Sequence, residues 1–517
     1  MIYHGNALAV LTTLPANHYH CVVTSPPYWS LRDYGVPPTI WDSDQACPHV
    51  WESAGTREGY TSKKKWQHSV NGRGDGGLHF ASNAPAMNGR GEPQSSARAR
   101  RRKDHPIGWQ PIEQGKFCAT CGAWLGCLGL EPTPELYVAH IVAIFDQVRR
   151  VLRKDGTLWL NIGDCFAAGK PRDSAAGGMQ FSQHQSFRRD RRPTGDIHHK
   201  AAPGIKPKDL VGIPWMVAFA LRASGWYLRM DNIWAKTNPM PESITDRPTK
   251  SHEYVFLFSK SEAYFYDKEA VREPDSCRSA GNKVRKHRVD HGGNPSLGNA
   301  HQGFSVPGGG RNLRSVWTFS TAPYKGAHFA TFPPRLPRLA ILAGTSARGC
   351  CPQCAAPFKR VIDLGDELRE QKVRGGCNAD GEYHGQSVKA YAGTGAQTPG
   401  DVKRRILQGM RERLTVGWRP TCACGGFRVK TSHSRRLRRR WYRERWQARL
   451  EARWSTLFGG VKPCRVLDPF HGVGTTSLVA VKLGRDADGI ELSAEYVALG
   501  ADRAARAQEA PGVASAG

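Results

Sequence analysis

The sequence predicts a doubly wound α/β fold with a mostly parallel sheet. Short apolar strands alternate along the chain with helical patterns, as expected for strands joined by helical crossovers. Near the C-terminus, a glycine-rich turn follows an apolar strand directly and precedes a helix, as in nucleotide-binding sheets. The length of 517 residues is sufficient for a core of roughly 250 residues and for further segments.

The periodicity predicts strands at residues 20–24, 156–162, 227–234, 254–259, 465–468 and 488–490. Helices are expected at residues 134–152, 210–224 and 477–483. The proline in the first turn of the second helix is tolerated, because an N–H there has no intrahelical partner. Residues 169–206 and 272–311 are rich in Gly, Ser, Arg and His, which predicts mobile loops.

The most informative motif is V-V-T-S-P-P-Y-W at residues 22–29, where an apolar strand ends in a Pro-Pro turn. Pro26 and Pro27 fix the backbone, so carbonyl oxygens stay outside any helix or ladder. With Ser25 and Tyr28, the turn presents acceptors beside an aromatic face. These features suit a nucleobase that carries an exocyclic amine. The alternative is a Pro-Pro loop with an incidental tyrosine.

A second motif is R-V-L-D-P-F-H-G-V-G-T-T at residues 465–476. Gly472 and Gly474 would let the backbone pass close to a ligand where a strand meets a helix. The phosphate-loop spacing G-x-x-x-x-G-K-[ST] is absent. Glu491 follows the next short strand, at a position where a carboxylate can accept hydrogen bonds from ribose hydroxyls. The layout indicates a nucleoside-binding site.

Together, the two motifs resemble those of the amino-methyltransferases that modify DNA at cytosine N4 or adenine N6. Their order, with the target-base motif first, is similar to the permuted β group of that family. Residues 228–238 resemble the family's late strands, and residues 328–333 resemble the segment before the cofactor motif. The resemblance covers roughly 300 residues, the size of a large domain. It implies a Rossmann-like S-adenosylmethionine-dependent methyltransferase fold with permuted motif order and two inserted segments.

The resemblance implies that catalysis depends on Ser25, Pro26, Pro27 and Tyr28. The serine hydroxyl and the Pro26 carbonyl would accept the amine hydrogens, and Tyr28 would stack on a flipped base. The cofactor-binding residues that it implies are Asp468, Phe470, Gly472, Gly474, Thr475, Glu491, Asn6 and Phe332. Asn6 stands where relatives often carry an aspartate.

The implied substrate is double-stranded DNA. Serine at the first position of S-P-P-Y favours cytosine N4, because N6-adenine enzymes more often carry Asp or Asn there. A non-catalytic DNA-binding protein on the same fold is an alternative. Methyltransferases acting on protein glutamine or RNA usually carry Asn-Pro-Pro-Tyr after the cofactor motif, the reverse of the order here. No nuclease carboxylate-lysine set is found, so a cognate restriction endonuclease would be a separate chain.

Two segments exceed what this resemblance requires, and both carry cysteines and dense basic charge. The expected division of the chain is core at 1–34, insert at 35–127, core at 128–346, insert at 347–463 and core at 464–517.

The cysteines of the two inserts predict two structural zinc sites. Each set has one C-x-x-C half and one half with a single intervening residue. The first set is Cys47, His49, Cys118 and Cys121, and the second is Cys351, Cys354, Cys422 and Cys424. Structural cysteines without metal are the alternative for either set. Cys350 could take the place of Cys351, although only Cys351 has the two-residue spacing to Cys354. The remaining cysteines are expected to be buried or incidental.

The formal charge of +29 indicates a polyanionic partner. Residues 435–453 combine arginines with interleaved aromatics, which predicts a helix that binds DNA phosphates. The arginines assigned to this contact are Arg435, Arg436, Arg438, Arg439 and Arg440. The basic run at 98–103 has a solvated arm as its alternative. No export signal or long apolar run is found, so we expect a cytoplasmic protein, bacterial or phage-encoded, without a membrane partner.

Overall fold

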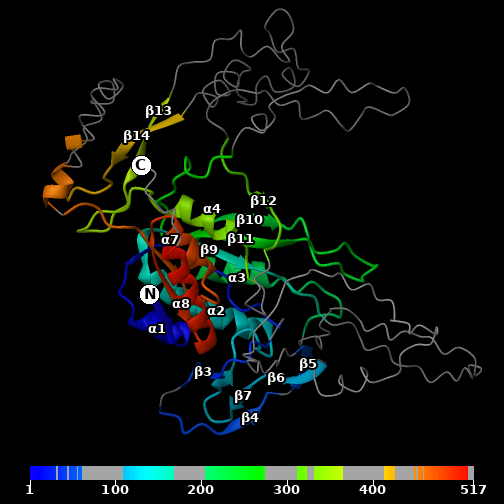
Figure 1. The fold of residues 1–517 in the computed structure, drawn as a ribbon. Coiled ribbons are helices and arrows are strands. Elements are labelled where there is room, and N and C mark those ends of the chain that lie inside the picture. The colour runs from blue at the N-terminus through cyan, green and yellow to red at the C-terminus, as the bar shows by residue number, and fades with distance from the viewer. Residues whose placement is uncertain are drawn as a thin grey trace, which may run out of the picture.

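The computed structural model describes residues 1–30, 33–43, 46–54, 56–60, 109–167, 204–273, 311–322, 331–364, 413–424, 448–449, 452–457 and 459–509. Its centre is an eight-stranded sheet with helices on both faces (Figure 1). The strands are β1 (Ile2–His4), β2 (Tyr19–Thr24), β9 (Leu152–Ile162), β10 (Tyr227–Ala235), β11 (His252–Ser259), β12 (Val316–Thr318), β15 (Arg465–Asp468) and β16 (Asp486–Glu491).

The strand order is β1-β16-β15-β2-β9-β11-β10-β12, so strands from the two ends of the chain lie side by side. Strand β11 is antiparallel to both of its neighbours, and the other neighbouring pairs of this sheet are parallel. The parallel strands therefore all end on the same side of the sheet, called the carboxyl edge below. It holds the carboxyl ends of β1, β16, β15, β2, β9 and β10 and the amino end of β11. The mostly parallel sheet that the sequence predicts is confirmed.

Helices α1 (Ala7–Thr13), α2 (Pro134–Val151) and α3 (Ile213–Ala223) pack on one face of the sheet. The other face is covered by α4 (Arg335–Gly344) and α7 (Thr475–Lys482), with α8 (Ala494–Glu509) beside α7. Strand β2 serves both layers, because Val22 packs in the first cluster while Cys21 and Val23 pack in the second. This alternation follows from the period of two residues along a strand.

The predicted strands and helices of the core are confirmed, with shifted ends. Strand β9 begins four residues before the predicted 156–162, at Leu152, and α3 begins at Ile213 rather than at residue 210. Helix α2 begins where Thr133 accepts a hydrogen bond from the Leu136 N–H, with Pro134 in the first turn. Strands β1 and β12 and helices α1, α4 and α8 were not predicted. The predicted loops at 169–206 and 272–311 lie almost wholly outside the described residues.

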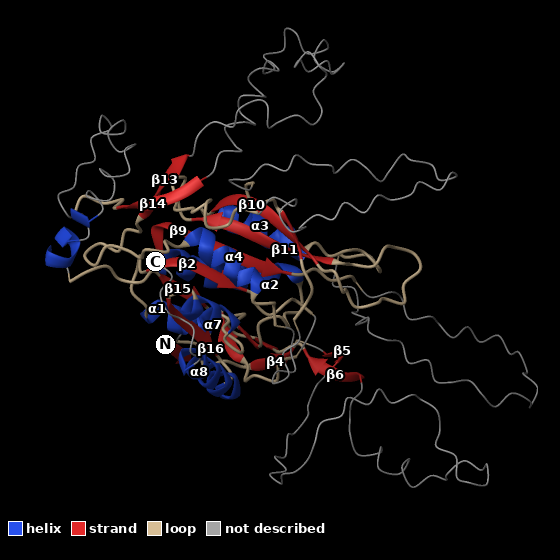
Figure 2. Cartoon of the chain, turned by 45° about the horizontal axis from the view of Figure 1, so that its top comes forward, coloured by secondary structure: helices blue, strands red, loops and turns tan. Residues whose placement is uncertain are grey.

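Two smaller structures lie outside the main sheet. Within residues 35–127, β3 (Thr39–Trp41), β8 (Trp124–Gly126), β7 (Lys116–Cys118) and β4 (Trp51–Ser53) form a four-stranded antiparallel sheet in that order, and β5 (Thr56–Tyr60) pairs with β6 (Trp109–Glu113). Within residues 347–463, β13 (Lys359–Leu364) pairs with β14 (Arg413–Arg419). Both views place these two structures at opposite ends of the core (Figures 1 and 2).

The segment that carries β13 and β14 leaves and rejoins the core at one point. The Cys350 N–H donates to the Lys462 carbonyl over 2.7 Å, and the Lys462 N–H donates back to the Cys350 carbonyl over 3.1 Å. In the same segment, the rings of Phe358 and Trp454 pack edge to face with centroids 5.3 Å apart, in a cluster with Cys351. Among the described helices, none has both the length and the apolar character needed to cross a membrane.

Candidate active site

The two sequence motifs meet at the carboxyl edge of the sheet, on adjacent strands. Leu467 of β15 lies in register with Val22 of β2. At the strand ends, the Thr24 hydroxyl donates to Asp468 Oδ1 over 2.6 Å, although the two residues are 444 positions apart. The Pro-Pro turn and the glycine turn therefore start from neighbouring points of one edge.

Asp468 ties the glycine turn to the strand that carries the Pro-Pro turn. Besides the Thr24 bond, it accepts hydrogen bonds from the Thr476 hydroxyl (2.7 Å) and the Phe470 N–H (3.1 Å). Burial raises the pKa of Asp468 to about 6, while these hydrogen bonds oppose the shift. The carboxylate thus fixes the relative position of the two turns.

The glycine turn requires left-handed backbone at two positions. Gly472 has φ 52° and Gly474 has φ 77°, values that L side chains rarely adopt. At Gly474 space is also limiting, because a Cβ atom would lie 2.8 Å from Cε1 of His471. Added Cβ atoms at Gly489 and Gly500 would meet the same ring. The turn therefore closes over a buried imidazole.

His471 is buried and neutral under the turn. Its Nε2 lies 2.9 Å from the Ser477 hydroxyl, and its buried Nδ1 has no hydrogen-bond partner among the described residues. Burial lowers the pKa of His471 to about 4.

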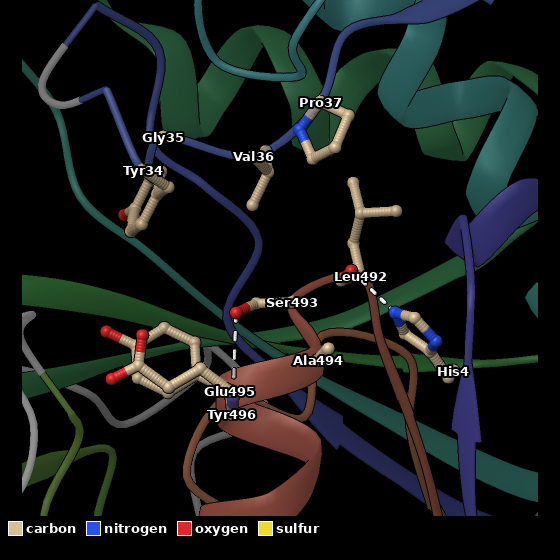
Figure 3. Close-up of a pocket in the computed structure, with 10 residues that line it drawn as sticks. All are labelled: His4, Tyr34, Gly35, Val36, Pro37, Leu492, Ser493, Ala494, Glu495 and Tyr496. Atoms are coloured by element: carbon tan, nitrogen blue, oxygen red, sulfur yellow. Dashed lines mark hydrogen bonds between the residues drawn. The ribbon is translucent and has the colours of Figure 1, made fainter.

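Glu491, at the end of β16, holds the backbone at Gly472 and at Ser493 through hydrogen bonds. Its carboxylate accepts the Gly472 N–H over 2.7 Å and the Ser493 N–H over 2.8 Å, and burial raises its pKa. The residues that follow Glu491 in the chain line a pocket of about 370 Å³. Its lining comes from the end of β1, the loop after the Pro-Pro turn and the start of α8, with residues His4, Tyr34, Gly35, Val36, Pro37, Leu492, Ser493, Ala494, Glu495 and Tyr496 (Figure 3).

Tyr28 of the Pro-Pro turn is held by polar side chains from two other strands. Its hydroxyl donates to Glu253 Oε2 over 2.7 Å, and the Asn161 side-chain N–H₂ group donates to the same oxygen over 3.0 Å. Lys236 Nζ lies 2.5 Å from Glu253 Oε1. The Ser25 hydroxyl donates to the Tyr28 oxygen over 3.3 Å. Burial and the Glu253 charge raise the pKa of Tyr28 well above its usual value, so the phenol keeps its proton.

The sequence motifs do not identify Glu253, Asn161 or Lys236 as site residues. These residues lie at or beside the ends of β11, β9 and β10, three strands whose ends share the edge with β2. A search for polar residues at predicted strand ends would have found them. The Pro27 carbonyl is also occupied, since it accepts the Tyr137 hydroxyl of α2 over 2.8 Å.

The remaining predicted residues lie in different settings. Asn6 begins α1, where its Oδ1 accepts the N–H groups of Leu8 (2.8 Å) and Ala9 (3.3 Å). Thr475 is buried at the start of α7, and Phe332 packs beside the cluster that contains α4. The arginines at 435–440 lie outside the described residues.

The structure brings together both predicted metal-ligand sets. In each set, the four ligand atoms lie within 4.8 Å of one another. In the first set, the sulfurs of Cys47 and Cys118 are 3.7 Å apart, and Cys121 Sγ lies 3.4 Å from His49 Nδ1. Tetrahedral zinc with Zn–S bonds near 2.3 Å separates its ligand atoms by about 3.7 Å. No disulfide joins any of the cysteines that the structure describes. The donor sets and their spacing fit zinc.

A third cluster joins His20, Cys350 and Cys464, all buried. Here His20 is already committed to hydrogen bonds, because its Nδ1 accepts the Arg465 N–H over 3.0 Å and its Nε2 lies 2.8 Å from the Ala355 carbonyl. The ring therefore has no free lone pair for a metal, and the two thiols remain as buried cysteines.

The structure therefore defines an α/β protein in which a glycine turn and a Pro-Pro turn follow adjacent, parallel strands of one sheet. Residues 19–351 and 465–502 match the DNA methylase family N6_N4_Mtase. The chain belongs to this DNA methylase family.

The chain is similar to several curated Type II methyltransferases. It is 34% identical over 345 residues to M.XycI of Xanthomonas campestris pv. cyanopsidis, covering 66% of this chain and 72% of the relative. With M.Cfr9I of Citrobacter freundii it shares 33% identity over 344 residues, with the same coverage. M.SmaI of Serratia marcescens is 40% identical over 228 residues, or 43% of this chain and 64% of the relative.

Solved structures are similar only at a low level. The cytosine-N4-specific PvuII DNA methyltransferase aligns with a TM-score of 0.38 and 12% identity, covering 98% of this chain and 89% of that one. The Thermus thermophilus protein TTHA0409, complexed with S-adenosyl-L-methionine, aligns with a TM-score of 0.35 and 14% identity, covering 98% and 93%. Similarity at this level supports no conclusion about substrate.

Proposed function

We propose that this protein is a site-specific DNA methyltransferase. It transfers a methyl group from S-adenosylmethionine to the exocyclic amine N4 of a cytosine that is flipped out of the duplex. The observation that carries the proposal is the meeting of the Pro-Pro turn and the glycine turn at one sheet edge, joined by the Thr24–Asp468 hydrogen bond. A methyl donor and an acceptor amine must lie within a few ångströms of each other for in-line transfer. Two ligand-binding turns on adjacent strands provide that proximity.

The glycine turn and the pocket beside Glu491 are the proposed cofactor site. Each carboxylate oxygen of Glu491 accepts one backbone N–H, which leaves acceptor capacity for ribose hydroxyls. Tyr34, Pro37 and Leu492 give the pocket apolar walls that suit a purine ring. The same proposal assigns Asp468, Phe470, Gly472, Gly474, Thr475, Asn6 and Phe332 to the cofactor site. When bound, the cofactor supplies an electrophilic methyl group.

The Pro-Pro turn is the proposed base site. Ser25 and the Pro26 carbonyl accept the amine hydrogens, which favours the pyramidal geometry that the nitrogen needs in order to attack. Tyr28 stacks on the base while Glu253 holds its hydroxyl. Since the amine lone pair reacts directly, no covalent enzyme intermediate is needed. Serine at the start of the motif supports cytosine N4 over adenine N6.

The proposal includes a permuted core with two zinc-bearing inserts. The target-base motif precedes the cofactor motif along the chain, and their strands are neighbours in the sheet. The family match leaves residues 352–464 uncovered, close to the proposed insert at 347–463. The strands at 39–126 outside the main sheet support an insert at 35–127. The spacing of both ligand sets supports structural zinc.

The proposed partner is duplex DNA, with Arg435, Arg436, Arg438, Arg439 and Arg440 on backbone phosphates. The net charge of +29 supports a polyanionic partner. Because the relatives are named Type II methyltransferases, a separate cognate restriction endonuclease is part of the proposal, as is a cytoplasmic location.

The test is methyl transfer to unmethylated duplex DNA from cofactor labelled in the methyl group. Mass spectrometry of the digested DNA should find the label in N4-methylcytosine. Label in N6-methyladenine would replace the assigned base. Absence of label, with cofactor binding measured, would favour the non-catalytic DNA-binding protein.

A further inference from the structure

A buried histidine outside the two turns makes contacts with two carboxylates. His140 of α2 is fully buried, and its Nδ1 lies 3.0 Å from Glu131 Oε1 while its Nε2 lies 3.0 Å from Asp42 Oδ2. A neutral imidazole carries one N–H and can donate to only one of them. The Asp42–His140–Glu131 triad therefore joins a buried imidazole to a buried carboxylate on one side and to a half-exposed carboxylate on the other. The proposed chemistry does not use it.

One arm of the triad leads to the Pro-Pro turn. Glu131 Oε2 accepts the Gly129 N–H over 2.8 Å, and the Glu131 carbonyl accepts the Trp29 indole N–H over 2.9 Å. The Gly129 carbonyl in turn accepts the Ser30 N–H over 2.7 Å. Trp29 and Ser30 directly follow Tyr28. Glu131 thus contacts the chain just after the proposed base-stacking ring in two ways: its carboxylate through Gly129, and its main-chain carbonyl through Trp29.

Helix α2 contacts the same turn a second time. Tyr137 lies three residues before His140, on the same helical face, and donates to the Pro27 carbonyl over 2.8 Å. The Gly129 backbone packs closely on the turn, because a Cβ there would lie 3.2 Å from the Pro27 Cβ and from the Tyr28 carbonyl oxygen. Contacts therefore hold the turn both before Tyr28, at Pro27, and after it, at Trp29 and Ser30.

The other arm leads to the small sheet of the first insert. Asp42 directly follows β3, and the imidazole of His140 stacks between Trp41 of β3 (centroids 4.4 Å apart) and Trp124 of β8 (5.3 Å). The indole N–H groups donate to backbone carbonyls at Gly126 and Gln114, so both rings are fixed within the small sheet. His140 therefore packs directly against the small sheet.

Backbone strain marks both ends of this connection. Ser30 has φ 62° and Asp42 has φ 56°, left-handed values in residues other than glycine. Such conformations persist where the surrounding contacts impose them.

We propose that the Asp42–His140–Glu131 triad is a positioning device that couples docking of the inserted segment at 35–127 to the geometry of the base pocket. This inference rests on the proposed function of the Pro-Pro turn. His140, Glu131 and Asp42 are positioning residues, because they act on the turn through the Gly129, Trp29 and Ser30 contacts.

The test uses two substitutions that each keep one arm. An asparagine amide approximates the position of Nδ1, so His140→Asn keeps a donor for Glu131. A glutamine amide approximates Nε2, so His140→Gln keeps a donor for Asp42. The measurements are turnover at saturating DNA and cofactor, the Kd for cofactor, and hydrogen exchange of the peptide that covers residues 27–30.

The loss of a hydrogen bond to a charged group corresponds to a change of roughly 10- to 100-fold. His140→Gln should lower turnover by about this factor and increase exchange at 27–30, while the cofactor Kd stays within about twofold. His140→Asn should retain more turnover and more protection. Unchanged turnover and exchange in both variants, or losses that only follow the folded fraction, would overturn the proposal.

Asp42→Gly covers the case in which neither His140 variant folds, because it removes the carboxylate and fits the left-handed backbone at this position. The Asp42 side chain is 58% exposed, so its substitution preserves the core. Lower turnover with faster exchange at 27–30 supports the coupling, and unchanged values of both overturn it. Wild-type protein that binds cofactor and DNA but transfers no methyl group would count against the proposed function alone, because hydrogen exchange still tests the triad.

Discussion

The Tyr28 hydroxyl donates a 2.7 Å hydrogen bond to Glu253, a residue 225 positions further along the chain. Glu253 is itself paired with Lys236 at 2.5 Å. The ring proposed to stack on the target base is therefore oriented before any ligand arrives. Fixing a side chain in advance lowers the entropy that binding must overcome.

Tyr28→Phe keeps the ring and removes its hydroxyl, so turnover should fall about tenfold through loss of orientation. Glu253→Gln should cost more, because it leaves Lys236, with only 22% of its side chain exposed, without a charged partner. Since both residues act on one contact, the double variant should resemble Glu253→Gln. Additive losses in measured kcat would show that Glu253 acts independently of Tyr28.

Ser25→Ala removes a proposed acceptor of the amine hydrogens while leaving the glycine turn intact. Turnover should fall by roughly 100-fold or more, and the Kd for cofactor should stay nearly constant. Single-turnover methyl transfer and calorimetric titration separate these two quantities. Full activity in this variant would show that the base pocket is assigned wrongly.

Gly474→Val should weaken cofactor binding by at least tenfold, because its Cβ would lie 2.8 Å from the His471 ring in left-handed backbone. Gly484→Ala is the matched control. Its φ of 72° is similar, but no atom lies within 4 Å of an added Cβ. Loss of stability without loss of cofactor affinity is expected for the control. Equal cofactor affinities in the two variants would rule out crowding at His471.

His471 should make stability sensitive to acid. The pKa in the folded protein is about 4, below the ordinary value near 6.5, so between these values the unfolded chain binds a proton that the folded chain excludes. The contribution of His471 to the unfolding free energy therefore declines as pH falls from 6.5 to 4, by on the order of 3 kcal/mol.

Asp468 opposes this effect. The pKa of Asp468 in the folded protein is about 6, so as the pH falls the folded protein binds this proton before the unfolded chain does. Lowering the pH therefore stabilises the folded state at this site. His471→Gln should remove the acid-destabilising contribution and leave that of Asp468. Urea unfolding from pH 7 to 4.5 should then show a variant that loses less stability with acid than the wild type. Parallel pH profiles would contradict the burial of a neutral His471.

Elemental analysis should find two zinc ions per chain if both ligand sets are occupied. Cys351→Ser should remove one ion, since Cys351 belongs to the second set, whereas Cys350→Ser should remove none. Chelation should loosen both inserts before the core unfolds, because metal binding is folding energy for such small structures. Two ions retained by the Cys351 variant would refute the ligand assignment.

The core was predictable because its signals are local. Val22, Val23 and Leu467 lie in short apolar strands bounded by Pro or Gly, and C-x-x-C spacing alone identified Cys118 and Cys121. Strand β1 has only three residues, too few for a periodic signal. The Tyr28–Glu253 bond and the His140 triad depend on which strands and loops become neighbours. Each of these residues stands in an ordinary local context, and tertiary structure alone reveals its partners.

The bridge between Cys350 and Lys462 brings the two ends of residues 351–461 together at the core, which the segment also contacts through the Arg360–Asp267 and Arg413–Glu269 ion pairs. Strand β15 starts from the same place whatever the length of that segment, and the entropy of closing a longer loop rises only slowly with length. We therefore expect a segment of different length between these two residues to leave the position of the glycine turn unchanged. The bridge is a natural junction for making chimaeras.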